Sequence, residues 1–492
     1  MMKKLIKNFI LILAVGLLSV ACSDDLNRVP FDSIEQSQSF KSINDAENWD
    51  NGFYAYFRGR VSGNIQFLPD VQSDQLNASK DFGNRNGFPH RWEGFLAADY
   101  DISDIWSKLY SGITNANIAI AGFETLELED PTEIATLEIY KADAHFVRAY
   151  YYFELVKRFS KDYDPATASS DLGVPLVLEY DVNALPARST VQQVYDQILA
   201  DIQVASTGLA GVSGSQGSNY FNADVVKALE ARVKLTMEDW SGAKTAADEL
   251  INSETYPLIT SETVLADMWT NDYAQEVIYQ PFLSAPNELT NTNSIYLGYN
   301  PDTDDFTPDF IPSKWVVDMY EDNDIRKNVY FDVKDVRIQG SVTPNIYLVN
   351  KFPGNPALWT SATTNYQNAP KVFRIAEMYL ISAEAALMST GDAATPLNAL
   401  REARGLSAIG SPTMQDLKDE RFRELAFEGF RLDDLKRWGD GVTRHDPQDL
   451  SLINTGSDYD SLSKDPSDPK FVWGIPARDQ TVNPNLVQNP GW

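Results

Sequence analysis

Three glutamates near the end of the chain have a spacing that suggests chemistry. Residues 419–439 read DERFRELAFEGFRLDDLKRWG, and on a helix Glu420, Glu424 and Glu428 would stack at i, i+4 and i+8. Like charges at this spacing repel by about a few tenths of a kcal/mol per pair, so the ladder needs cations opposite it. The candidate cations are arginines within and before this helix, namely Arg421, Arg423, Arg431, Arg374, Arg401 and Arg404. We interpret the ladder as a structural ion-pair network that joins this helix to the preceding helix pair, not as catalytic acids.

The sequence lacks the usual signatures of catalysis. His90, His145 and His445 are the histidines of the chain, and none lies in an H-E-x-x-H pattern. Since Cys22 is the single cysteine, no zinc-ligand spacing is present either. The nucleophile-elbow, dinucleotide-binding and P-loop patterns do not occur. We therefore expect no metal, no cofactor and no enzymatic activity, and we interpret His145, within a predicted helix, as structural.

Two stretches have the composition of a sugar-binding surface. Sugar binding needs flat aromatic faces for ring C–H groups and fixed amide, carboxylate or guanidinium groups for hydroxyls. Residues 61–100 and 255–370 are rich in such residues and show weak helical periodicity, so we interpret both as long loops. Loops of this size are usually functional. The alternative for each aromatic is burial in a core, and we expect at least half of them to be buried.

Composition and charge limit the partners of the protein. The chain has 492 residues, 43% of them hydrophobic and 23% charged, which is enough apolar material for a sizeable core. The formal net charge is -29. Nucleic-acid binding and attachment to anionic lipid both rely on basic patches, so this balance excludes them. An uncharged glycan is compatible with so acidic a protein.

The N-terminus predicts export. Residues 1–21 combine a basic start at Lys3, Lys4 and Lys7 with an apolar run from Phe9 to Ala21 that is too short to span a membrane. Cys22 follows directly, and Ser19 to Cys22 resemble a bacterial lipobox with Ser19 at the usual leucine position. We expect cleavage before Cys22 and lipidation of its thiol; an ordinary signal peptide is the alternative. Ser23-Asp24-Asp25 resembles a surface-export signal of Bacteroidetes lipoproteins.

Helical periodicity dominates the remaining sequence. It predicts a first helix over 43–57 and a second over 102–123. Asp130, Thr190 and Asn222 are capping residues at the starts of further helices. Two helix pairs, within 223–251 and 372–404, have alanines at their packing positions and look like tetratricopeptide-type repeats.

Six segments in order resemble the SusD/RagB family of Bacteroidetes outer-membrane lipoproteins. They are the lipobox, RAYYYFELVKRFS at 148–160, the helix pair with ALEARVKL, VFRIAEMYLISAEAALMSTGD at 372–392, ERFRELAFEGFRLDDLKRWG at 420–439, and the ending IPARDQTVNPNLVQNPGW. The resemblance implies a mostly α-helical fold, with four tetratricopeptide-type helix pairs as scaffold and a loop-rich ligand-binding subdomain. On this basis we divide the chain into a signal peptide (1–21), an N-terminal region (22–220), a helix pair (221–254), a loop-rich aromatic insertion (255–370) and a C-terminal region (371–492).

The resemblance also implies a function and a site. Family members typically bind oligosaccharides, are not enzymes, and act as a lid on a SusC-like TonB-dependent transporter. Their ligand site draws on the segment after the first helix and on the middle loop-rich part. Carried onto this chain, the first gives Asp70, Asp74, Arg85, Asn86 and Trp92, and the second gives Trp269, Tyr296, Tyr299, Trp315 and Trp359.

Three other functions remain open at this point. A peptide-binding member of the same family would have the same scaffold and transporter. A surface glycosidase needs two carboxyl groups about 5–10 Å apart, and 70 acidic residues make some such pair inevitable without identifying it. A repeat protein that grips a protein partner through its helix pairs is compatible with the glycan-binding hypothesis.

Overall fold

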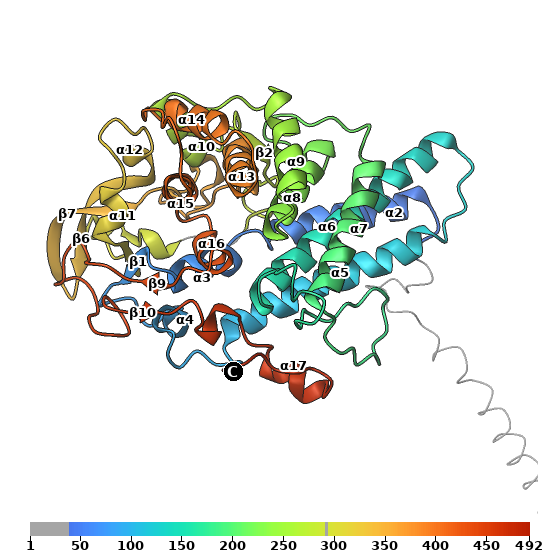
Figure 1. Cartoon of the computed structure of the whole chain (residues 1–492), viewed down its shortest axis with the longest axis horizontal. Helices are drawn as coiled ribbons and strands as arrows, with labels where there is room; N and C mark the ends of the chain where they lie inside the picture. The colour runs from blue at the N-terminus through green and yellow to red at the C-terminus, as the bar shows by residue number, and fades with distance from the viewer. Residues whose placement is uncertain (1–38, 291–293) are drawn as a thin grey trace, which may run out of the picture.

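The computed structural model describes residues 39–290 and 294–492, and the fold is mostly α, with 45% helix and 10% strand (Figure 1). The predicted signal peptide and the lipidation site at Cys22 lie outside the described residues and stay predictions. No helix of the described ranges combines the length and the apolar character that a membrane crossing requires.

The segment after the first helix is more ordered than its composition predicts. The first helix, α2 (Ile43–Arg58), matches the prediction. The interpretation of 61–100 as long loops is wrong, because this stretch forms α3 (Asn64–Gln72), β1 (Leu76–Ala78) and α4 (Gly87–Arg91). Seven of the nine residues of α3 are buried, so tertiary packing stabilises a helix whose sequence pattern is weak.

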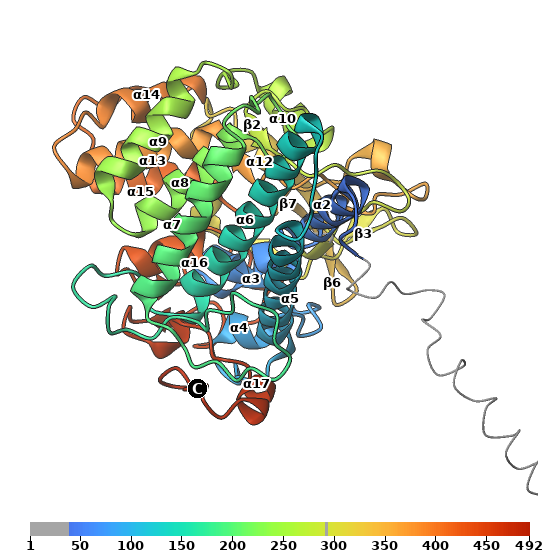
Figure 2. The ribbon, with the colours of Figure 1, turned by 90° about the vertical axis from the view of Figure 1, so that its right-hand side faces the viewer.

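Five long helices form the helical half of the molecule. They are α5 (Tyr100–Phe123), α6 (Pro131–Phe159), α7 (Val191–Gly208), α8 (Ala223–Thr236) and α9 (Trp240–Asn252). The predicted caps are confirmed: Asp130, Thr190 and Asn222 each accept a hydrogen bond from the first turn of the helix that follows. Figures 1 and 2 show α5, α6, α7 and α8 side by side. In the largest apolar core, Phe146 of α6 packs against Phe57 of α2 and against Phe221, which lies just before α8.

The C-terminal helices continue this arrangement. Helix α13 (Ile375–Met388) packs against α9, against α14 (Ala394–Ala403) and against α15 (Met414–Leu425). Short connections make helix hairpins of α5–α6, α8–α9 and α13–α14. The division into four tetratricopeptide-type pairs stays a prediction, as do the domain boundaries. Two short helices follow, α16 (Arg431–Arg437) and α17 (Ala477–Val482).

Residues 255–370 form the loop-rich half, against which α15 packs. Its helices are α10 (Glu262–Thr270), α11 (Lys314–Asp318) and α12 (Lys327–Tyr330), and its short 3-10 turns are Ser294–Tyr296 and Pro356–Leu358. A four-stranded sheet has the order β3 (Tyr299–Asn300), β4 (Asp305–Phe306), β6 (Phe331–Ile338) and β7 (Ser341–Val349). The β6–β7 hairpin was not predicted; its two-residue turn has positive φ at both Gln339 and Gly340, the geometry that suits a twisted hairpin.

Short strands join the loop-rich half to the rest of the chain. β5 (Phe310–Pro312) pairs with β1 and places Leu76 opposite Pro312. β2 (Val277–Tyr279) pairs with β8 (Phe373–Arg374), and β9 (Val442–Thr443) pairs with β10 (Ser463–Lys464). The segment after the first helix therefore lies against the middle of the chain, as the resemblance implies.

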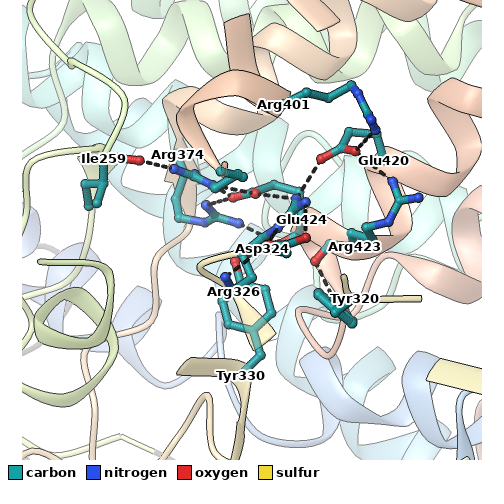
Figure 3. A network of polar contacts seen from close by, with 12 residues as sticks. Ile259, Tyr320, Asp324, Arg326, Tyr330, Arg374, Arg401, Glu420, Arg423 and Glu424 are labelled. Carbon is teal, nitrogen blue, oxygen red and sulfur yellow. Dashed lines mark hydrogen bonds and ion pairs between the residues drawn. The ribbon is translucent and has the colours of Figure 1, made fainter. Parts of the chain in front are cut away.

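A buried ionic network lies where α14 and α15 meet the loop-rich half (Figure 3). Glu424 contacts Arg326, Arg374 and Arg404, with N–O distances of 3.0, 2.7 and 2.9 Å. Glu420 contacts Arg326, Arg401 and Arg423. Burial raises the pKa of Glu424, but the charges of Arg404 and Arg374 outweigh it and hold that pKa well below its ordinary value. The prediction of a structural network is confirmed.

Two details of that prediction are wrong. The helix ends at Leu425, and Phe427 and Gly429 have φ of 65° and 84°, so Glu428 lies in a turn and not on the ladder. A Cβ at Gly429 would lie 2.4 Å from the carbonyl oxygen of Gln66, which explains the glycine.

The partners of the glutamates also differ in part from those expected. Arg421 pairs with Asp434 and Arg431 with Asp74, so neither faces the glutamates. Arg326 and Lys351 from the loop-rich half contact them instead.

Candidate functional site

Two of the predicted site residues in the first segment are carboxylates that hold the fold together. Asp70 of α3 is fully buried and accepts hydrogen bonds from the Gln75 side chain at 2.7 Å and from the Gly429 N–H at 2.9 Å. Burial raises its pKa to about 8. Asp74 forms a bidentate ion pair with Arg431, at 2.9 and 2.6 Å. Both carboxylates already have hydrogen-bond or ion-pair partners within the protein and have almost no exposed surface. We therefore place them outside the ligand-contact surface.

Asn86 and Trp92 are also buried. The Asn86 amide donates to the Asp101 carboxylate at 2.9 Å, and the Trp92 indole N–H donates to the Gln72 carbonyl oxygen at 2.7 Å. Trp92 is 4% exposed and packs edge-on against Phe471. Its ring therefore offers no face for sugar stacking in this structure.

The second predicted group divides between core and surface. Trp269 and Tyr296 are 2% and 1% exposed and belong to the apolar core of the loop-rich half. Trp315 is half-buried between Phe422 and His445. Tyr299 and Trp359 are half-buried as well; Tyr299 begins β3 of the four-stranded sheet, and Trp359 directly follows the 3-10 turn Pro356–Leu358.

Arg85 joins the two predicted segments at the surface. Its guanidinium lies 3.0 Å from the Asp309 carboxylate and 3.4 Å from the Ser294 hydroxyl. Burial raises the pKa of Asp309 to about 6, and the charge of Arg85 acts in the opposite direction. The same middle segment carries Tyr299, whose backbone N–H donates to the Tyr366 hydroxyl at 2.6 Å. Tyr299 packs against Phe306 with ring centres 5.2 Å apart.

A pocket of about 280 Å³ opens between the α2–α3 turn and α5. We call it the α2–α3 pocket. Its lining combines apolar side chains with the polar or charged Arg60, Asn64, Asp104 and Lys108. Contact between the hydroxyls of Ser62 and Thr290, at 2.5 Å, brings the loop-rich half to the edge of the pocket. Sequence reasoning selected this region of the chain but missed these residues.

Asp101 connects the α2–α3 pocket to Arg85. Its two carboxylate oxygens accept from Asn64 at 2.5 Å and from Asn86, the neighbour of Arg85 in sequence, at 2.9 Å. Burial, and then the charge of Asp99, raise the pKa of Asp101 to about 6. Tyr100 beside it is 67% exposed. Asn86 and Asp101 are buried, so they join the pocket to Arg85 beneath the surface, while the exposed Arg85 and Tyr100 offer the donor groups and the aromatic face that hydroxyl-rich ligands require.

Comparison with known protein families identifies the chain. Residues 32–235 match the model described as "Starch-binding associating with outer membrane", and residues 313–492 match the model described as "SusD family". The chain belongs to the SusD family. Among curated relatives, this SusD family chain is 24% identical to SusD-like protein P38 of Formosa agariphila, over 98% of its own length and 97% of that protein. It is 36% identical to the starch-binding protein SusD of Bacteroides thetaiotaomicron, over 25% of its own length and 21% of that protein.

Solved structures show the same fold. A SusD superfamily protein from Bacteroides thetaiotaomicron has a TM-score of 0.78 at 23% identity, covering 91% of this chain and 100% of that one. A laminarin binding SusD-like protein has a TM-score of 0.67 at 21% identity, covering 92% of this chain and 100% of that one. The SusD family fold is therefore shared over nearly the whole described chain.

Proposed function

We propose that this SusD family chain is a non-catalytic glycan-binding lipoprotein of the cell surface. It is anchored to the outer membrane through Cys22, captures oligosaccharides and delivers them to a SusC-like TonB-dependent transporter. The family assignment supports glycan binding and outer-membrane association, because one matching model describes starch binding at that membrane. The laminarin-binding protein of the same fold supports a neutral glycan as the ligand.

The observation that carries the proposal is the surface between the α2–α3 pocket and Arg85. Arg60, Asn64 and Arg85 supply donors for sugar hydroxyls, and Tyr100 supplies an exposed ring for C–H stacking. A neutral sugar pays no electrostatic penalty at a protein with a formal net charge of -29, whereas an acidic polysaccharide is repelled.

Affinity electrophoresis of the purified mature chain tests this proposal. Gels containing laminarin, starch, fructan, mannan or xylan compare neutral polymers directly, and retardation in at least one is expected. Tyr100→Ala should lower the affinity for the retarding polymer by roughly tenfold, about 1.4 kcal/mol. Because Tyr100 is 67% exposed, the variant should retain the fold.

Tyr180→Ala is the matched control, since Tyr180 is 51% exposed and does not line the α2–α3 pocket. Equal effects of the two substitutions would remove Tyr100 from the site. Failure of every polymer to retard the chain, with retention of peptides instead, would favour the peptide-binding alternative. Release of reducing sugar by the purified chain would contradict a non-catalytic role. Co-purification of a TonB-dependent barrel with the lipidated chain tests the delivery step.

A further inference from the structure

A second pocket opens along the same helix, next to the α2–α3 pocket. We call it the Trp49 pocket. Its volume is about 350 Å³, and its lining comes from α2, α5 and α6 and from Ser39 in the segment that precedes α2: Ser39, Asp45, Asn48, Trp49, Gly52, Phe53, Tyr56, Gly112, Asn115 and Tyr151. A space of this size lies within the range of small-molecule sites.

Tyr56 stands between the two pockets. It lines the Trp49 pocket, while the Arg60 guanidinium, which lines the α2–α3 pocket, lies 4.1 Å from the centre of its ring. The Tyr56 hydroxyl donates to the carbonyl oxygen of Lys108, another lining residue of the α2–α3 pocket, at 2.8 Å. The two pockets are therefore neighbours along the seam between α2 and α5, with Tyr56 between them.

The walls of the Trp49 pocket are rigid and aromatic. The Trp49 ring is stacked on Phe40, with centroids 5.4 Å apart and planes 12° apart, which holds the indole flat. Tyr151 approaches Gly112 so closely that a Cβ there would lie 2.4 Å from the tyrosine ring. Glycine at that position lets the ring form the base of the pocket.

Two amide side chains of the pocket lining are available for hydrogen bonds to a ligand. Within residues 39–290 and 294–492, the side chains of Asn48 and Asn115 make no hydrogen bond. Each amide offers two donors and an acceptor, which suits the mixed donor and acceptor character of sugar hydroxyls. Asp45 is the one charged residue in the lining, so the pocket favours a neutral sugar over an acidic one.

We propose that the Trp49 pocket is a second sugar subsite, which takes a neutral pyranose unit of the same glycan that occupies the α2–α3 pocket. The glycan chain would cross the Arg60–Tyr56 pair between the two pockets. This inference rests on the proposed function and adds a length requirement to it. Occupying two linked subsites raises the affinity for long chains without altering that for short ones.

Gly52→Leu tests the proposal by filling the pocket. A Cβ at Gly52 meets nothing within 4 Å, so the leucine side chain enters open space. Leucine is also a better helix former than glycine, so α2 should be retained. Ala55→Leu is the matched control, because Ala55 is exposed on the same helix and lies outside the pocket lining.

Binding of laminarin and soluble starch is compared with binding of laminaribiose and maltose, using the mature chain. Gly52→Leu should lower the affinity for the polymer that binds by roughly tenfold and leave its disaccharide unchanged. Ala55→Leu should change neither. Unchanged polymer affinity in Gly52→Leu, or an equal loss for polymer and disaccharide, overturns the second subsite and leaves the proposed function intact.

One further variant and one further binding outcome complete the experiment. Asn48→Ala, which removes an amide and leaves the aromatic walls in place, should weaken polymer binding in the same length-dependent way. Failure of the unmodified chain to bind any polymer of the gel series, laminarin, starch, fructan, mannan and xylan, overturns the proposed function and this inference together.

Discussion

The helical half and the loop-rich half bury their polar groups in different ways. In the helical half, α5 to α9 satisfy their backbones internally and meet through apolar side chains such as Phe146 and Leu229. Where the loop-rich half meets the C-terminal helices, Arg326, Arg374, Arg404 and Glu424 are each no more than 2% exposed. Short strands and turns leave carbonyl oxygens that no regular ladder pairs, and buried cations supply the missing donors.

The pKa values of the buried cations differ according to whether each cation binds backbone carbonyl oxygens or carboxylates. Arg444 donates to the carbonyl oxygens of Val71 and His90 and forms no ion pair among the described residues, and burial lowers its pKa to about 9. Lys351 donates to two carbonyl oxygens and to Glu428, and burial lowers its pKa to about 8. Arg404 faces Glu276 and Glu424, and their charges raise its pKa. The loop-rich half therefore relies on many buried charges, whereas the helical half relies mainly on its apolar core, to which ion pairs such as that of Arg148 with Asp201 are added.

The largest effect should come from removing the central carboxylate. Glu424→Gln leaves Arg326, Arg374 and Arg404 without the charge they share, and breaking a buried ion pair costs about 3–5 kcal/mol. Urea denaturation should show this loss in the free energy of unfolding. Glu402→Gln, at an exposed position of α14, should stay within about 0.5 kcal/mol. A loss below about 1 kcal/mol in Glu424→Gln would show that the network is dispensable.

The second largest effect should be a difference between the two halves in the stability cost of a conservative substitution. Arg326→Lys keeps the charge but cannot reproduce the contacts that the guanidinium makes with Asp324, Glu420 and Glu424. We expect it to cost about 2 kcal/mol, the value of a hydrogen bond to a charged group. Leu229→Met, in the core of the helical half, should cost less than about 1.5 kcal/mol. Similar costs for both, measured in the same denaturant series, would remove the contrast.

The smallest effect concerns pH, and here Asp50 and Glu424 should act in opposite directions. Asp50 of α2 lies near Asp143 of α6, to which the Tyr54 hydroxyl donates at 2.6 Å. Burial raises the pKa of Asp50 to about 7 and raises that of Asp143. The folded state then holds protons that the unfolded state releases, so this pair loses stabilising effect as pH rises from about 4 to about 7.

Asp50→Asn should flatten that dependence and raise the melting temperature at pH 8 relative to the unmodified chain. Glu424 shifts the pH dependence of stability in the opposite direction. Its pKa is lowered, so its contribution to the free energy of unfolding is present above the unfolded pKa and is lost in acid. Melting temperatures between about pH 3 and pH 8 check both, because the contribution of Glu424 changes only below its unfolded pKa of 4.5. An unchanged slope in Asp50→Asn would show that the carboxyl pair does not titrate in this range.

Local signals predicted the helical half well. Asp130, Thr190 and Asn222 mark helix starts because a capping side chain acts within a few residues of itself. The same reasoning failed for α3, which has a proline inside it and is stabilised by burial. It also missed Arg326 and Lys351, because nothing near Glu424 in sequence indicates a partner from the loop-rich half.

By itself the sequence determined the family, the order of the long helices, the structural role of the glutamates and the two segments that approach each other at Arg85. Only the tertiary structure decided which aromatic and polar residues of those segments reach the surface. Trp92, Trp269 and Tyr296 fill cores, while Tyr100, Arg60 and Asn64 border solvent or a pocket. The physical reason is that an aromatic ring which stacks on sugar and one which packs in a core use the same apolar face. Burial, which depends on distant parts of the chain, distinguishes the two.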